Sequence, residues 1–137
     1  MLTTMTLFAF LAEPAAAAVT PAERRAAAVA AGFRLRGATI INECDLAVEN
    51  LTVERRDLNG DGAPELIVTD ESGCYGAAGI RFAVLRKAGA GWSSVLMTQG
   101  VMTVKPTRRG GWPDIEIGGP GFGRMPVARW NGSKYVW

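Results

Sequence analysis

The sequence predicts a mainly β domain with one short N-terminal helix, and three observations lead to this prediction. Glycine occurs 17 times and proline 7 times in the 137 residues, which supplies many turns. Hydrophobic residues make up 48% of the chain, enough to form a core. Short runs of alternating or β-branched residues lie between the turn residues. A compact antiparallel barrel, a sandwich and a small propeller-like set of sheets all fit this pattern.

Residues 1–18 have the features of a secretory signal peptide. Leu7 to Leu11 form a short apolar run, and Ala16 to Ala18 place small residues before Val19. We therefore expect cleavage after Ala18, a single domain over residues 19–137, and a periplasmic or secreted location. A misassigned start or a disordered leader is the alternative. No later segment reaches the ~20 apolar residues that a membrane span needs, so no span is expected.

A helix is expected directly after this leader. Thr20 is a suitable N-cap, Pro21 suits the first helical position, and Glu23 completes a capping-box pattern. The alanine-rich run continues to Ala31, and Gly32 is a natural end. The helix offers little apolar surface, so we expect it to pack as a short flap over the β part.

The rest of the chain reads as short strands that pair through hairpins. A loose glycine loop at Lys87–Gly91 joins two of them, and Asn131-Gly132 predicts a type I′ turn between the last two. The expected strands are Leu51–Glu54, Glu65–Thr69, Phe82–Leu85, Trp92–Leu96, Val101–Val104, Asp114–Ile117, Val127–Trp130 and Lys134–Trp137.

Composition excludes several classes of function. Histidine is absent from the chain, which removes Ser-His-Asp and Cys-His catalysis and most zinc sites. The formal net charge is only +2 and the arginine pairs are scattered, so no nucleic-acid interface is expected. Carboxylate pairs such as Asp70 with Glu71, or Asp114 with Glu116, leave catalysis formally open, but we expect a non-catalytic protein.

Cys44 and Cys74 are expected to form a disulfide, because an exported protein folds in an oxidising compartment. Such a bond closes a loop of about thirty residues and stabilises the fold by ~3–4 kcal/mol in the chain-entropy model. Two buried free thiols are the alternative, since the spacing does not fix the distance between the Cα atoms.

The strongest motif is the acid-rich segment from Asp57 to Glu65. Oxygen-bearing side chains alternate along it, and Gly62 follows where the chain must bend. A hard cation such as Ca²⁺ takes six to eight oxygen ligands, so the pattern predicts a Ca²⁺ site. A metal-free Asx-turn loop is the alternative, but its carboxylates would repel each other. The expected ligands are Asp57, Asn59, Asp61, the Ala63 carbonyl and Glu65.

The stretch DLNGDGAPELIV resembles the calcium loops of FG-GAP and related bacterial β repeats. It differs from an EF-hand, whose bidentate Glu stands at the twelfth loop position, because Val68 occupies that position here. The resemblance implies a calcium ion that stabilises the flanking strands.

The segment that follows, Asp70 to Gly76, contains an S-G-x-Y sequence formed by Ser72, Gly73 and Tyr75. The loop could protrude, with Tyr75 as a rigid anchor for a partner's cleft. This segment resembles the periplasmic i-type lysozyme inhibitor family and related immunity proteins against secreted peptidoglycan-cleaving enzymes. The resemblance implies that Ser72, Gly73 and Tyr75 insert into the active site of a lysozyme-like or other cell-wall hydrolase.

Three alternatives remain at this stage. Asp70–Gly76 can be an ordinary polar loop, and the whole domain can be an FG-GAP-like structural or adhesive module that uses calcium only for stability. The slightly basic charge argues against an inhibitor of a strongly basic lysozyme, and a target that is not strongly basic would remove this objection. The four tryptophans can form either a sugar-binding platform or core and rim packing: Trp92, Trp112, Trp130 and Trp137.

Overall fold

The computed structural model describes residues 18–121 and 123–137 and has a mainly β architecture. The predicted signal peptide falls on residues 1–18 and, apart from Ala18, lies outside the described residues. The elements are α1 (Pro21–Ala30), β1 (Arg34–Arg36), β2 (Thr39–Ile41), β3 (Thr52–Arg56), β4 (Glu65–Asp70), a 3₁₀ turn η1 (Gly76–Ala78), β5 (Arg81–Ala88), β6 (Gly91–Gln99), β7 (Val101–Arg109), β8 (Trp112–Gly118), β9 (Val127–Trp130) and β10 (Tyr135–Val136).

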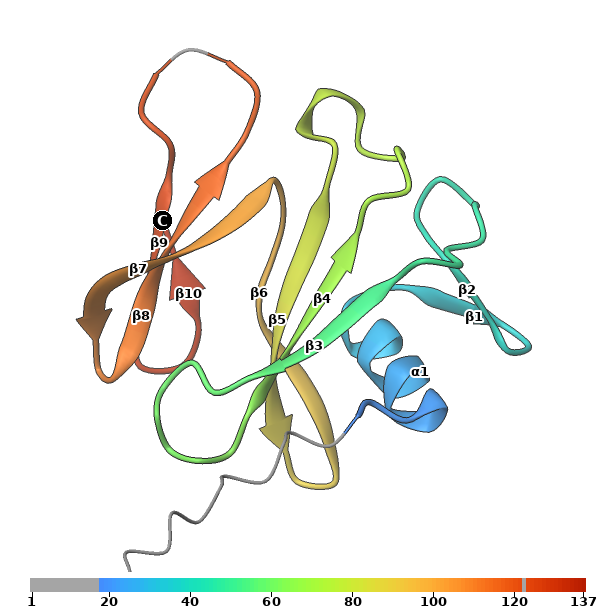
Figure 1. Ribbon diagram of the computed structural model, residues 1–137, viewed down its shortest axis with the longest axis horizontal. Helices are drawn as coiled ribbons and strands as arrows, with labels where there is room; N and C mark the ends of the chain where they lie inside the picture. Colours follow the sequence, from blue (N-terminus) through green and yellow to red (C-terminus); the bar gives the residue numbers. More distant parts are fainter. Residues whose placement is uncertain (1–17, 122) are drawn as a thin grey trace, which may run out of the picture.

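Two four-stranded antiparallel sheets build a β sandwich (Figure 1). One sheet has the strand order β3-β4-β5-β6 and the other the order β10-β9-β8-β7, while β1 and β2 form a separate hairpin. The described strands do not close into a barrel, so the sandwich is the member of the predicted set that the chain adopts. Every expected strand region is present, and the β1–β2 hairpin is an addition that the sequence reading missed.

The sheet β3–β6 is the middle layer of the molecule, with the second sheet on one face and α1 on the other (Figure 1). Along β4, Ile67 enters the core between the sheets, whereas Leu66 and Val68 enter the core beneath the helix. Successive side chains of a strand point to opposite faces, so a strand covered on both faces needs an uninterrupted apolar run. This explains why β4 and β5 do not alternate with polar residues.

The predicted N-terminal helix is confirmed. The Thr20 hydroxyl accepts a hydrogen bond from the Glu23 N–H at 3.1 Å, and Pro21 opens the helix. Ala27 and Ala28 are fully buried against the sheet, since their small side chains let the helix approach closely. Arg55 of β3 forms an ion pair with Glu23. At 10 residues α1 is too short to cross a membrane, and no other described helix is long and apolar enough.

The predicted hairpin at Asn131-Gly132 is confirmed, but the predicted type I′ turn is wrong. Trp130 pairs with Tyr135, so the connection has four residues rather than two. Only Gly132 has a positive φ, at 105°, whereas a type I′ turn requires it at both central residues. The Asn131 side chain explains the difference, because its Oδ1 accepts hydrogen bonds from the N–H groups of Ser133 and Lys134, both at 3.0 Å.

The tryptophans do not form one exposed platform. Trp112 and Trp130 stack with ring centroids 4.1 Å apart, and Tyr135 packs edge-on against both. These three rings are buried in the core between the sheets. Trp92 packs partly buried at the helix-side core, and Trp137 is 63% exposed. Core and rim packing is therefore the role that the structure gives to three of the four.

Candidate metal site and the disulfide loop

The two loops for which the sequence predicted a metal site and a partner contact lie at opposite ends of β4 (Figure 1). The acidic loop, residues 57–65, joins β3 to β4 and ends with Glu65, the first residue of β4. The disulfide loop, residues 71–75, follows Asp70, the last residue of β4. Both strand-end carboxylates are buried, Glu65 with 3% and Asp70 with 0% of its surface exposed. A buried carboxylate is costly unless it has a partner, so each end of β4 needs an explanation.

The acidic loop brings three carboxylates together. One ligand oxygen from each of Asp57, Asp61 and Glu65 lies within 4.8 Å of the other two. Asp57 holds the bend, because its two carboxylate oxygens accept hydrogen bonds from the N–H groups of Gly60 at 2.9 Å and Gly62 at 3.0 Å. Both glycines have positive φ, 73° and 82°, which other residues rarely adopt. The sequence reading identified the bend at Gly62 but not the one at Gly60.

Asn59 and Ala63 are tied to the same group through Asp61. The Asp61 N–H donates to Asn59 Oδ1 at 3.2 Å, and Asn59 Nδ2 donates to Asp61 Oδ2 at the same distance. The Ala63 N–H donates to Asp61 Oδ1 at 2.8 Å. These short-range bonds are the ones that an Asx-turn loop forms by itself. They curl the loop so that its acidic side chains face one another.

Glu65 is the member of the group that the protein interior affects most. Its Oε2 accepts a hydrogen bond from the Leu58 N–H at 2.7 Å. Burial raises the pKa of Glu65, and the nearby Asp61 and Asp57 charges raise it further, against the opposing effect of the backbone hydrogen bonds. Within the described ranges, no Lys or Arg forms an ion pair with any of the three carboxylates. The loop therefore gathers three carboxylates that, in the described part of the chain, have hydrogen-bond donors but no ion-pair partner.

The residues present fit a hard divalent cation. Carboxylate oxygens are ligands that hard divalent cations prefer, so three carboxylates within one short loop could hold such an ion. The amide oxygen of Asn59 and the backbone carbonyl of Ala63 belong to the same loop and are the further ligands expected from the sequence.

The predicted disulfide is confirmed at the other end of β4. Cys44 and Cys74 are bonded, with their Cα atoms 5.8 Å apart and 30 positions apart in the sequence. The bond joins the disulfide loop to the segment after β2, which the Ile41–Ala47 bridge holds in a turn. The alternative of two free thiols is excluded.

Asp70 is surrounded by hydrogen-bond donors. The Tyr75 hydroxyl donates to Asp70 Oδ2 at 2.6 Å, Asn42 Nδ2 donates to the same oxygen at 3.3 Å, and the Ser72 N–H donates to Oδ1 at 2.9 Å. Burial by itself raises the pKa of Asp70, but the bonds from Tyr75, Ser72 and Asn42 outweigh it, so the pKa is lowered. Sequence reasoning missed Asn42, since nothing in its surroundings along the chain marks it as a partner of Asp70.

The structure corrects the expected role of Tyr75. Its side chain is only 5% exposed and is directed into the protein toward Asp70, so its phenol cannot enter a partner's cleft. Tyr75 was expected at the tip because polar loops usually protrude, whereas here the buried Asp70 carboxylate draws the hydroxyl inward. Ser72 and Gly73 are exposed, as is Glu71. Beside them opens a pocket of about 350 Å³, lined by residues of the segment 47–50 together with Asp70, Glu71 and Ser72.

The chain was compared with protein-family models, curated proteins and solved structures, and none of them matches it.

Proposed function

We propose that this protein is an exported, non-catalytic β-sandwich domain that binds one Ca²⁺ ion in the acidic loop. One observation carries the proposal: the carboxylates of Asp57, Asp61 and Glu65 converge within 4.8 Å. Like charges at such distances repel one another, and a cation between them would remove this repulsion. The bound ion would receive the three carboxylates, with Asn59 and the Ala63 carbonyl as further ligands, and would fix the start of β4.

Export is supported by the Cys44–Cys74 bond, since disulfides persist mainly in oxidising compartments. The non-catalytic part of the proposal is supported by composition. Without histidine, the chain lacks the usual general base near neutral pH.

Calorimetry with Ca²⁺ tests the metal site. Wild-type protein should bind one ion and gain about 2.7 kcal/mol of stability when free Ca²⁺ is a hundred times the Kd. Asp57→Ala removes a carboxylate on the exposed side of the loop and should abolish both effects. Glu54→Ala is the matched control, because Glu54 is an exposed acid on the neighbouring strand β3 and is not part of the group. A wild-type melting curve that is the same with calcium and with chelator would refute the site.

We propose further that the disulfide loop binds a lysozyme-like or other cell-wall hydrolase, with Ser72 and Gly73 as the contacts. Two observations favour this use of the loop. Ser72 and Gly73 are exposed, and the Cys44–Cys74 bond and the bonds to Asp70 hold the loop in one conformation. A pre-organised loop loses less conformational entropy on binding. In this proposal the buried Tyr75 does not contact the partner, and it positions the loop through its hydrogen bond to Asp70.

Ser72→Arg tests the partner loop, with Ser133→Arg as its control. Both serines are exposed turn residues, and the same bulk and charge are introduced in two different loops that are far apart in the sequence. If wild type inhibits chicken-, goose- or invertebrate-type lysozyme, Ser72→Arg should weaken inhibition at least tenfold, whereas Ser133→Arg should inhibit like wild type. Equal inhibition by both variants would remove the loop from the interface. Binding of calcium without inhibition of any lysozyme class would favour the FG-GAP-like structural or adhesive module.

A further inference from the structure

The acidic loop is built into the interface between the two sheets. Leu58, the second residue of the loop, is 2% exposed. It belongs to the core between the two sheets, which also contains Ile115 and Trp112. Its neighbours are accessible, Asp57 being exposed and Asn59 half-buried, and neither belongs to that core. The loop therefore has one face in the proposed metal site and one residue anchored between the sheets.

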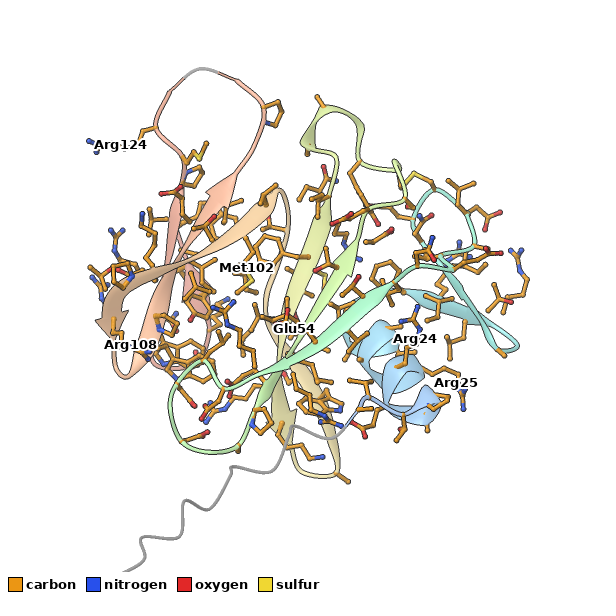
Figure 2. All side chains as sticks on the ribbon, viewed as in Figure 1. Arg24, Arg25, Glu54, Met102, Arg108 and Arg124 are labelled. Carbon is orange, nitrogen blue, oxygen red and sulfur yellow. A yellow bond between two sulfur atoms is a disulfide. The ribbon has the colours of Figure 1, made fainter. Side chains whose placement is uncertain are left out.

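Arg108 connects this anchor to the second sheet. It stands near the end of β7, and Figure 2 labels it beside the loop that joins β3 to β4. Its Nη1 donates a hydrogen bond to the Leu58 carbonyl at 3.0 Å and another to the Gly111 carbonyl at 2.9 Å. Gly111 itself lies against the loop, since a Cβ at this position would be 3.9 Å from the Asn59 carbonyl oxygen. The β7–β8 turn and the acidic loop thus form one continuous contact.

The backbone of Leu58 is held at both its N–H and its carbonyl. Its N–H donates to Glu65 Oε2 at 2.7 Å, and its carbonyl accepts from Arg108. Moving the second sheet away would release the carbonyl, free the Leu58 side chain and change the position of the N–H that orients Glu65. The Glu65 carboxylate is thus linked, through the backbone of Leu58, to a contact between the two sheets.

We propose that Arg108 is a positioning residue of the calcium site, through which metal binding and the docking of the two sheets stabilise each other. The inference rests on the proposed function of the acidic loop. Thermodynamic linkage makes the coupling reciprocal: docking strengthens calcium binding, and calcium strengthens docking by the same factor. Arg108 does not touch a metal ligand, and it acts only through the Leu58 carbonyl.

Arg108→Met tests this coupling because two effects of the change have opposite signs. Removing a positive charge near three carboxylates favours Ca²⁺ by electrostatics alone, so a residue without a positioning role would leave the affinity equal or increase it. Loss of positioning should instead weaken calcium binding about tenfold in calorimetry, which corresponds to the contribution of about one hydrogen bond from a charged donor. Arg109→Met, which removes the same charge from the next, exposed residue, should leave the affinity unchanged or slightly higher.

Arg108→Lys keeps the positive charge, and it replaces Arg108→Met as the test of the coupling if Arg108→Met does not fold. With fewer donors to share between two carbonyls, it should bind calcium more weakly than wild type but no more weakly than the methionine variant. Equal or tighter binding by the substituted Arg108 proteins overturns the coupling while leaving the metal site intact. Failure of the wild type to bind Ca²⁺ is a different result, which refutes the proposed function and the coupling with it.

Discussion

The two ends of β4 each bury a carboxylate, and the surrounding chain satisfies them to different degrees. At the far end, Asp70 receives hydrogen bonds from Tyr75, Asn42 and Ser72, and a disulfide closes the loop beside it. At the near end, Glu65 receives the Leu58 N–H and faces two further carboxylates. The pKa is accordingly lowered at Asp70 and raised at Glu65.

Under our proposal, this difference separates a carboxylate whose partners the protein itself supplies from a group of carboxylates that binds a metal ion. Donors supplied by the chain stabilise the charged form of Asp70, so its loop has a fixed conformation without any added group. Glu65 and its neighbours present the reverse situation, in which a cation would supply what the chain does not. β4 thus connects a loop that is stabilised by hydrogen bonds and a disulfide to a loop that binds calcium under our proposal. Four predictions test this contrast.

The largest expected effect comes from the disulfide end. Cys44→Ser combined with Cys74→Ser should lower the free energy of unfolding by about 3–4 kcal/mol, because the open chain regains loop entropy in the unfolded state. Urea unfolding measures the loss, and reduced wild-type protein should match the variant. Calcium affinity should stay within about twofold of wild type, since the bond lies at the other end of β4. A large change in affinity would show that the two ends are not independent.

A smaller effect is expected from the Asp70 hydrogen bond. Tyr75→Phe should cost about 2 kcal/mol of stability, since it removes a donor from a buried charged acceptor. Tyr135→Phe is the matched control: its hydroxyl is also buried but donates to the neutral Pro113 carbonyl at 2.7 Å, so its loss should cost about 1 kcal/mol. Equal losses would mean that the charge of Asp70 does not strengthen its bond.

This contribution should also depend on pH. The pKa of Asp70 in the folded protein is lower than its ordinary value of 3.8. The stability that the ionised carboxylate contributes is therefore present above pH 3.8 and is lost as the pH falls through the folded-state pKa. The difference in stability between wild type and Tyr75→Phe should shrink over that window in urea unfolding. A difference that grows on acidification would contradict the assignment.

The smallest expected effect is at Glu65 in calcium-free protein, and it has the opposite sign. Because the folded-state pKa exceeds the ordinary 4.5, the folded protein retains a proton that the unfolded chain has lost. Stability should therefore fall as the pH rises from 4.5 through the folded-state pKa. Glu65→Gln still offers an oxygen to the Leu58 N–H and should lack this decline. Urea unfolding with chelator at pH 5 and pH 7 measures the decline in stability. Added Ca²⁺ should abolish the decline in wild type, whereas Glu65→Gln should show none with or without Ca²⁺.

The parts of the fold that the sequence predicted correctly depend on neighbours along the chain. The helix cap at Thr20, the acidic bend at Asp57–Gly62 and the two predicted hairpins all form over a few residues. The first hairpin was expected to have a loose loop over Lys87–Gly91, but Ala88 pairs with Gly91, which leaves a two-residue turn. The turn at Asn131 was assigned the wrong type because its side chain bonds the backbone beyond it. The β1–β2 hairpin was missed because its strands are only three residues long.

The sequence alone determined the class of structure and the acidic loop, because composition, turn residues and oxygen spacing act locally. It favoured a bond between Cys44 and Cys74, but the tertiary structure decided it by bringing two Cα atoms that are 30 positions apart to within 5.8 Å. Only the tertiary structure decided that Tyr75 points inward, that Asn42 completes Asp70, and that Arg108 reaches Leu58 from the other sheet. Each of these contacts joins a buried polar group to a partner that the packing of the layers brings near. Such a group must find a partner inside the fold, but which one it finds depends on how the sheets stack.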